Sequence, residues 1–117
     1  MPRIDHVAVE SKDPAATAAF YARFFGARIV RTEGHPVMAY LGTTSFALHK
    51  PGGPGPHTGI RVSEQELEEL RRELDSAGIA WRERDHGIAV GVFFEDPDGR
   101  RVEAIWYRGG EDPRTPE

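Results

Sequence analysis

The stretch GVFFEDPDGRRVEAIWY, Gly91–Tyr107, contains the pattern that decides the fold. Two mainly apolar segments flank the tetrapeptide DPDG (residues 96–99), in which proline presets one turn position and glycine tolerates positive φ. The pattern predicts two antiparallel strands joined by a tight turn. In the second strand a carboxylate, Glu103, stands among apolar residues. Because a buried charge is costly unless it is paired or bound to a metal, we expect Glu103 to have a partner.

The composition is that of one globular domain without a nucleic-acid or membrane partner. The chain has 117 residues, of which 38% are hydrophobic and 29% charged, and its formal net charge is −4. No basic cluster stands alone, which argues against nucleic-acid binding, and no cysteine offers a thiolate ligand. No apolar run approaches the roughly 18 residues of a membrane span, and the N-terminus has no apolar signal region. A cytoplasmic protein is therefore expected.

Both halves of the chain show the same order of elements: strand, helix, strand, strand, strand. An internal duplication explains this order. We expect one α+β domain over residues 1–107, made of a first βαβββ module, residues 1–50, and a second, residues 57–107. The tail, residues 108–117, is expected to be disordered.

Each module has one helix with recognisable ends. The first is predicted to begin at Asp13-Pro14 and to end at Gly26. Phe20 and Phe24 repeat at helical spacing in it, so their stripe should lie on a sheet. The second helix is predicted to begin at the capping box of the SEQE segment, residues 63–66.

Aligning the two halves brings chemically reactive side chains to equivalent positions. His6 falls on His57, in each case on a strand whose alternate residues are apolar, and Phe46 falls on Glu103. If both histidines face away from the helices, two imidazoles and one carboxylate converge. A set of two histidines and one carboxylate leaves coordination positions open for water or substrate.

The segments IDHVAV, AFYARFFGA, HTGIRV and FFEDPDGRRVEAIW resemble the vicinal oxygen chelate superfamily. This superfamily includes glyoxalase I, extradiol dioxygenases, fosfomycin-resistance enzymes and bleomycin-resistance proteins. The resemblance implies paired βαβββ modules that form an open, cup-shaped mixed sheet around a divalent metal. It assigns the metal ligands to His6, His57 and Glu103, and it matches the fourth ligand of glyoxalase I to Phe46.

The function implied by the resemblance is that of a small metalloenzyme, with Glu103 as the candidate catalytic residue. A divalent ion (Mn, Fe, Zn, Ni or Co) would act as a Lewis acid on two adjacent oxygens of a small-molecule substrate, in a glyoxalase-like lyase or isomerase or in a dioxygenase. Phe93 stands where two-domain extradiol dioxygenases carry a tyrosine, which weakens the case for ring cleavage. The alternative is a metal-free protein that sequesters a small molecule, as bleomycin-resistance proteins do. Because relatives commonly dimerise, a homodimer is expected.

Further side chains are candidates for contact with a substrate. Glu10 and Arg61 share the strand faces of the two histidines, whereas His86, in an Asp-His-Gly turn, is interpreted as solvated. Some of the apolar candidates could equally be plain core. The predicted pocket residues are Phe46, Leu48, Arg61, Phe93, Arg101 and Tyr107.

Overall fold

The computed structural model describes residues 2–116, which divide into two compact units. The N-unit comprises residues 6–56 and 114–116, and the C-unit comprises residues 2–5 and 57–113. Their strands make up an eight-stranded mixed sheet. The predicted α+β fold of two βαβββ modules is therefore confirmed, whereas the disorder of the tail stays a prediction.

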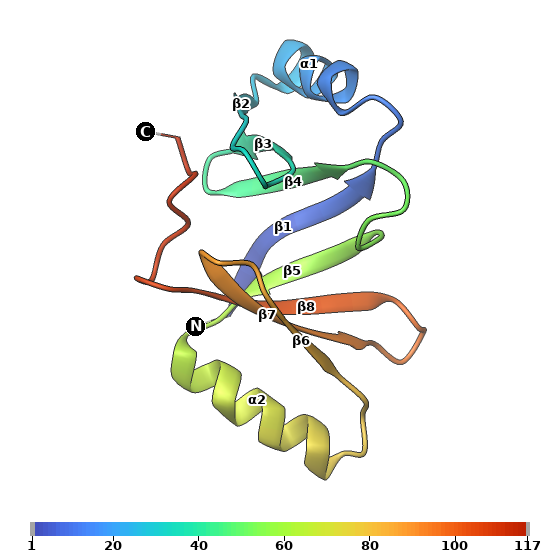
Figure 1. The fold of residues 1–117 in the computed structure, drawn as a ribbon, viewed down its shortest axis with the longest axis vertical. Coiled ribbons are helices and arrows are strands. Elements are labelled where there is room, and N and C mark those ends of the chain that lie inside the picture. The colour runs from blue at the N-terminus through green and yellow to red at the C-terminus, as the bar shows by residue number, and fades with distance from the viewer. Residues whose placement is uncertain (1, 117) are drawn as a thin grey trace. The chain divides into compact units, whose positions relative to one another are not determined.

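The N-unit contains the strand order β2-β3-β4-β1 and one helix (Figure 1). Strands β1 and β4 are parallel, and the other neighbours are antiparallel. Parallel neighbours need a long connection, which α1 and the following hairpin supply. The elements are β1 (Arg3–Glu10), of which residues 3–5 belong to the C-unit, α1 (Pro14–Phe25), β2 (Arg28–Val30), β3 (Val37–Leu41) and β4 (Thr44–His49).

Helix α1 has the predicted ends but presents a different face to the sheet. Asp13 caps its first turn, where its carboxylate accepts the Ala16 amide hydrogen, and Gly26 ends it in the left-handed conformation. Phe20 and Phe24 are 51% and 59% exposed, so the prediction that their stripe lies on the sheet is wrong. The buried position is Ala18, because a small side chain lets the helix approach the strands closely.

The C-unit repeats this arrangement with the strand order β5-β8-β7-β6 (Figure 1). Strands β5 and β8 are parallel, and β8, β7 and β6 are antiparallel neighbours. The predicted capping box is present at the start of α2, where Ser63 and Glu66 bond each other's backbone amides. The elements are β5 (His57–Arg61), α2 (Glu64–Ser76), β6 (Arg82–Asp85), β7 (Ala89–Glu95) and β8 (Arg101–Tyr107).

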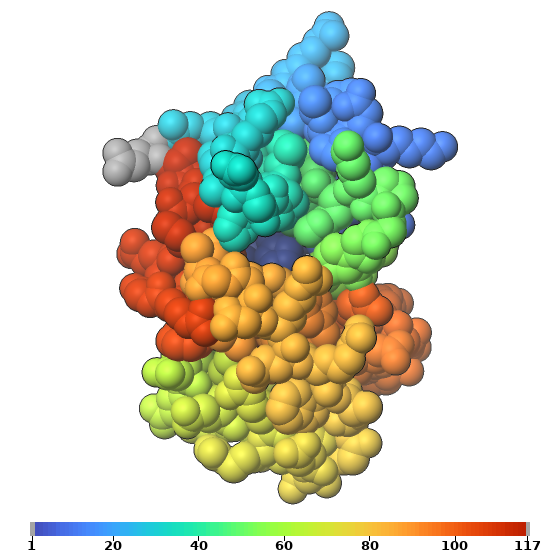
Figure 2. Space-filling model, in the orientation of Figure 1, coloured from blue at the N-terminus to red at the C-terminus, as the bar shows by residue number. Residues whose placement is uncertain are grey.

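The C-unit has a hydrophobic core between α2 and one face of its strands. Leu67 and Leu74 of α2 pack with Val90 and Val92 of β7 and with Ala104 of β8. In the space-filling view the yellow-green helix adjoins the amber segment that contains β6 (Figure 2). Because side chains alternate along a strand, Glu103 lies on the opposite face from Ala104. The core thus leaves the second face of the C-unit for other chemistry.

Strand register corrects the alignment of the two modules by one residue. His6 stands beside Ser45 and Ala8 beside Ala47, whereas Gly59 stands beside Glu103 in the C-unit. With His6 equivalent to His57, the counterpart of Glu103 is Ala47 and not Phe46. A shift of one residue moves a side chain to the other face of a sheet. The two β-hairpins have turns of different length, which letter-by-letter alignment did not take into account.

Neither helix among residues 2–116 is long and apolar enough to cross a membrane.

Candidate metal centre

Glu103 is a buried carboxylate that lies between two imidazoles of the C-unit. The residue is 1% exposed and is among the largest fully buried side chains. Its Oε1 lies 3.3 Å from Nε2 of His57, and its Oε2 lies 2.8 Å from Nε2 of His86. The expectation that this carboxylate needs a partner is therefore confirmed, with two imidazoles in that role.

The neighbouring strands leave room for the carboxylate. Glu103 stands beside Gly59 of β5 and opposite Phe93 of β7. A Cβ atom built on Gly91 would lie 2.1 Å from Oε2 of Glu103, closer than carbon and oxygen can approach. Glycine at position 91 is thus required by the carboxylate and not by the backbone, since Gly91 is absent from the positive-φ glycines.

His57 begins β5 and points its ring to the same face as Glu103. The residue is 7% exposed, and the ring of Phe93 meets its ring edge-on with centroids 5.2 Å apart. Phe93 therefore shields one side of the imidazole from water. In its neutral form an imidazole has a nitrogen lone pair with which it can bind a metal ion.

His6 directly follows Asp5, which the C-unit holds firmly. Nε and Nη2 of Arg61 donate to Oδ1 of Asp5 at 2.9 and 2.6 Å, and the Tyr107 hydroxyl donates to Oδ2 at 2.8 Å. Asp5 is 2% exposed, so its charge is buried together with these partners. Because a peptide bond joins Asp5 to His6, this anchor restricts the backbone that carries the histidine. Sequence reasoning missed Asp5, whose signal was a carboxylate in a strand together with Ile4, Val7 and Val9.

His57 and Glu103 of the C-unit are buried side by side, and His6 of the N-unit is buried as well; all three are residue types that can hold a metal ion. Each offers one ligand atom of the nitrogen or oxygen type that divalent first-row metals accept. The donor chemistry therefore fits the divalent ion that the sequence implied.

His86 corrects the interpretation of a solvated turn residue. Its side chain is only 27% exposed, because its ring reaches back over β7 to Glu103. The ring also lies edge-on to Phe93, with centroids 6.3 Å apart. The Asp-His-Gly pattern indicated the turn, but no sequence signal gave the direction of the side chain.

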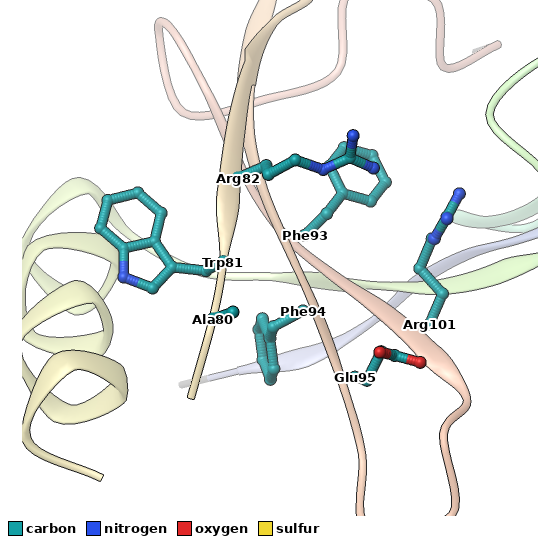
Figure 3. Close-up of a pocket in the computed structure, with 7 residues that line it drawn as sticks. All are labelled: Ala80, Trp81, Arg82, Phe93, Phe94, Glu95 and Arg101. Carbon is teal, nitrogen blue, oxygen red and sulfur yellow. The ribbon is translucent and has the colours of Figure 1, made fainter. Parts of the chain in front are cut away.

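A cavity of about 280 Å³ opens next to Phe93 in the C-unit (Figure 3). The figure shows the Arg82 side chain extending to the Phe93 ring, with Arg101 farther to the right in the view. Phe93 thus borders both the cavity and His57. Two of the predicted pocket residues, Phe93 and Arg101, line this cavity. The full lining is Ala80, Trp81, Arg82, Phe93, Phe94, Glu95 and Arg101.

The other predicted pocket residues have different surroundings. Phe46 stacks on Tyr21 of α1 with ring centroids 4.4 Å apart, and Leu48 is 1% exposed. Arg61 and Tyr107 both bond Asp5, and the guanidinium of Arg61 also lies 4.7 Å from the Tyr107 ring centroid. Glu10, the other candidate for substrate contact, ends β1 and is exposed.

The turn that carries His86 is fixed by an exposed ion pair. Nη1 and Nη2 of Arg108 each lie 2.9 Å from a carboxylate oxygen of Asp85. Hydrogen bonds from Arg108 and from the Gly87 amide hold the pKa of Asp85 well below its usual range. The same pair raises the pKa of Arg108. The turn is therefore braced by charges that persist across the neutral range.

Residues 3–104 match the model of the Glyoxalase/Bleomycin resistance protein/Dioxygenase superfamily. The chain belongs to this superfamily, as the resemblance of its motifs implied. A family match of this extent agrees with the strand order and with the paired modules described above.

Individual relatives differ in length and in named activity. The sequence is 28% identical over 113 residues to an iron-dependent extradiol dioxygenase of Rhodococcus jostii (strain RHA1), covering 86% of this chain and 37% of that protein. This chain thus spans little more than a third of the length of that relative. The structure of methylmalonyl-CoA epimerase from Mycobacterium tuberculosis has a TM-score of 0.71 at 20% identity, covering 90% of this chain and 87% of that one. The structure of a catechol 2,3-dioxygenase has a TM-score of 0.70 at 20% identity, covering 90% of this chain and 40% of that one. At these identities the structural likeness shows the fold alone.

Proposed function

We propose that this protein is a divalent-metal-dependent enzyme whose ion is held by His6, His57 and Glu103. The observation that carries the proposal is the buried Glu103 carboxylate, with an imidazole 3.3 Å from one oxygen and another 2.8 Å from the other. A buried carboxylate beside imidazole nitrogens is well suited to accept a cation, because a buried charge is costly unless it is paired or bound to a metal. The bound ion would supply Lewis-acid chemistry to adjacent oxygens of a small substrate.

The chain's own residues have separate roles in this proposal. The two histidines and Glu103 bind the ion, and the Asp5 anchor holds the backbone before His6. Phe93 keeps water from His57 and forms an apolar surface in the neighbouring cavity, against which a small substrate would pack. The reaction is of the lyase, isomerase or dioxygenase type. The Rhodococcus relative is named as iron-dependent, so Fe²⁺ is the first ion to test.

Metal analysis of the gently purified protein tests the proposal. We expect about one divalent ion per chain, lost from both His57→Ala and Glu103→Ala and retained in the control His35→Ala, whose histidine lies in the turn before β3. Circular dichroism of each variant checks that the fold persists. Retention of the ion in both ligand variants would contradict the proposal.

A metal-free sequestering protein of the bleomycin-resistance type is the alternative. It predicts a protein without a bound ion that takes up a small molecule equally well before and after Glu103→Ala. A panel of hemithioacetals, epoxides and catechols, read by thermal shift and product analysis with each ion, separates the two functions and narrows the reaction type.

Dimerisation and location are further proposals about the same protein. The exposed Phe20, Phe24 and Phe25 of α1 offer apolar surface that favours association into a homodimer. Analytical ultracentrifugation at micromolar concentration is expected to give twice the mass of the chain, and a monomer only would contradict this. The cytoplasmic location rests on the composition alone.

A further inference from the structure

His86 contacts the metal-binding carboxylate without belonging to the proposed ligand group. Its Nε2 lies 2.8 Å from Oε2 of Glu103, while Oε1 of the same carboxylate faces His57. An ionised carboxylate can only accept hydrogen bonds, so the proton of this bond lies on the His86 nitrogen. One oxygen of Glu103 is therefore occupied by a donor within the C-unit.

Hydrogen bonds restrict the backbone of the turn that carries the His86 ring. The carboxylate of Asp85 accepts the Gly87 amide hydrogen at 2.8 Å, and Nη1 of Arg108 donates to the Gly87 carbonyl at 2.6 Å. The amide of His86 itself donates to the Ala89 carbonyl at 2.8 Å. Gly87 has a φ of 82°, which favours glycine in this turn. These bonds fix the backbone on both sides of the histidine.

The surroundings of the hydrogen bond between His86 and Oε2 of Glu103 are equally restricted. Gly91 has no Cβ at the place where one would meet Oε2 of Glu103, and Phe93 lies edge-on to the His86 ring. The carboxylate can therefore keep the orientation in which Oε2 meets His86. In that orientation Oε1 faces Nε2 of His57, the other proposed ligand of the C-unit.

We propose that His86 is a positioning residue that makes Glu103 a one-oxygen ligand. This rests on the proposed metal function. With Oε2 bonded to His86, Oε1 would be the oxygen that Glu103 presents to an ion, and the position that a second carboxylate oxygen would take would stay available to substrate oxygens. Groups that hold metal ligands from behind typically change affinity by about 10- to 100-fold when removed.

Mn²⁺ binding to the full-length protein tests this assignment. Titration calorimetry is expected to show that His86→Ala weakens Mn²⁺ binding by about 10-fold. His86→Gln, whose amide can donate to the same oxygen, should recover most of the affinity, and His35→Ala is the matched control. Thermal melts without metal report any loss of fold that is independent of the ion.

Water-proton relaxation by bound Mn²⁺ gives a readout that a purely structural role would not change. In His86→Ala the released oxygen is free to join the ion, so fewer exchangeable waters are expected on Mn²⁺ than in the wild type or in His86→Gln. Unchanged affinity and unchanged hydration in His86→Ala would overturn this proposal alone. Loss of binding in His86→Ala as complete as in Glu103→Ala would also overturn it, since His86 would then be a ligand itself. A wild-type protein that binds no divalent ion would overturn both this and the proposed function.

Discussion

The two units use the same face of the same strand arrangement for different purposes. In the N-unit, Ala8, Met38, Tyr40 and Ala47 form a buried apolar cluster. By strand register, the counterparts of Ala8, Met38 and Ala47 in the C-unit are Gly59, Phe93 and Glu103. At these positions the N-unit has apolar side chains, whereas the C-unit has a glycine, an aromatic ring and a buried charge; farther along β7 and β8 the C-unit also has an apolar cluster, formed by Ala89, Ile105 and Tyr107.

This difference shows how a duplicated module can separate stability from chemistry. The apolar cluster of the N-unit stabilises the fold by burying apolar surface, and this needs no reactive side chain. The carboxylate of the C-unit instead requires a glycine beside it and imidazoles at both oxygens. The arrangement around Glu103 gives up apolar packing contacts. A domain can tolerate this loss when a second apolar cluster, here that of the N-unit, is intact.

The largest effect is expected from deleting a side chain of the apolar cluster. Met38 is 2% exposed, so Met38→Ala should lower the free energy of unfolding by about 3 kcal/mol because it removes buried contacts and leaves a cavity. The half-buried counterpart, Phe93→Ala, should cost less stability but change metal binding. Urea unfolding together with Mn²⁺ titration measures both quantities. Equal losses of stability in the two variants would remove the proposed contrast.

A smaller effect is expected from adding one methyl group beside Glu103. Gly91→Ala places a carbon on the position of Oε2, so the carboxylate must move away from His86. We expect a loss of about 2 kcal/mol in unfolding free energy, as for other overpacked sites, and weaker Mn²⁺ binding. The control is Gly53→Ala, where an added Cβ meets nothing nearer than 3.5 Å. Wild-type stability in Gly91→Ala would show that the Glu103 carboxylate can move away from position 91 at little cost.

The smallest effect is expected at the braced turn and only in acid. Because hydrogen bonds from Arg108 and Gly87 lower the pKa of Asp85 below its unfolded value of 3.8, its contribution to stability is present above that pH. The contribution is lost as pH falls toward the folded pKa. Asp85→Asn should therefore flatten the decline of melting temperature between about pH 5 and pH 2, and change little at pH 7.

The control for this acid effect is Glu68→Gln on the exposed face of α2. It should leave the acid decline as steep as in the wild type. A profile of Asp85→Asn that superimposes on that of Glu68→Gln would show that the turn is not braced by this charge.

The order of elements and the two helix starts followed from short-range chemistry. The caps at Asp13 and Ser63 depend on a side chain and an amide a few residues away, so the local sequence contains the needed information. The pairing of Glu103 with His57 also followed, because both modules repeat and alternation assigns a face to each residue. Such features are encoded within one strand, one turn or one repeat.

The features that sequence reasoning missed depend on distances across the sheet. His86 meets Glu103 across β7, and Gly91 is needed only because a carboxylate approaches from the next strand. Register decides both, and a difference in hairpin length moved Phe46 to the wrong face in the alignment. The exposed aromatic residues of α1 were misjudged because a helical period allows more than one stripe to face the sheet. The large side chains of Phe20 and Phe24 favoured their stripe, whereas the stripe with the small Ala18 is the buried one.

The anchor at Asp5 has a consequence for the order in which the protein forms on the ribosome. Its partner Tyr107 lies 102 positions away, and its other partner Arg61 lies 56 positions away. Residues 6–56 can pair their strands while synthesis continues, but the start of β1 must wait for the last strand to emerge. The Asp5 anchor is therefore completed only at the end of synthesis, so a truncation before β8 would release a chain in which Asp5 keeps Arg61 but lacks the Tyr107 hydroxyl.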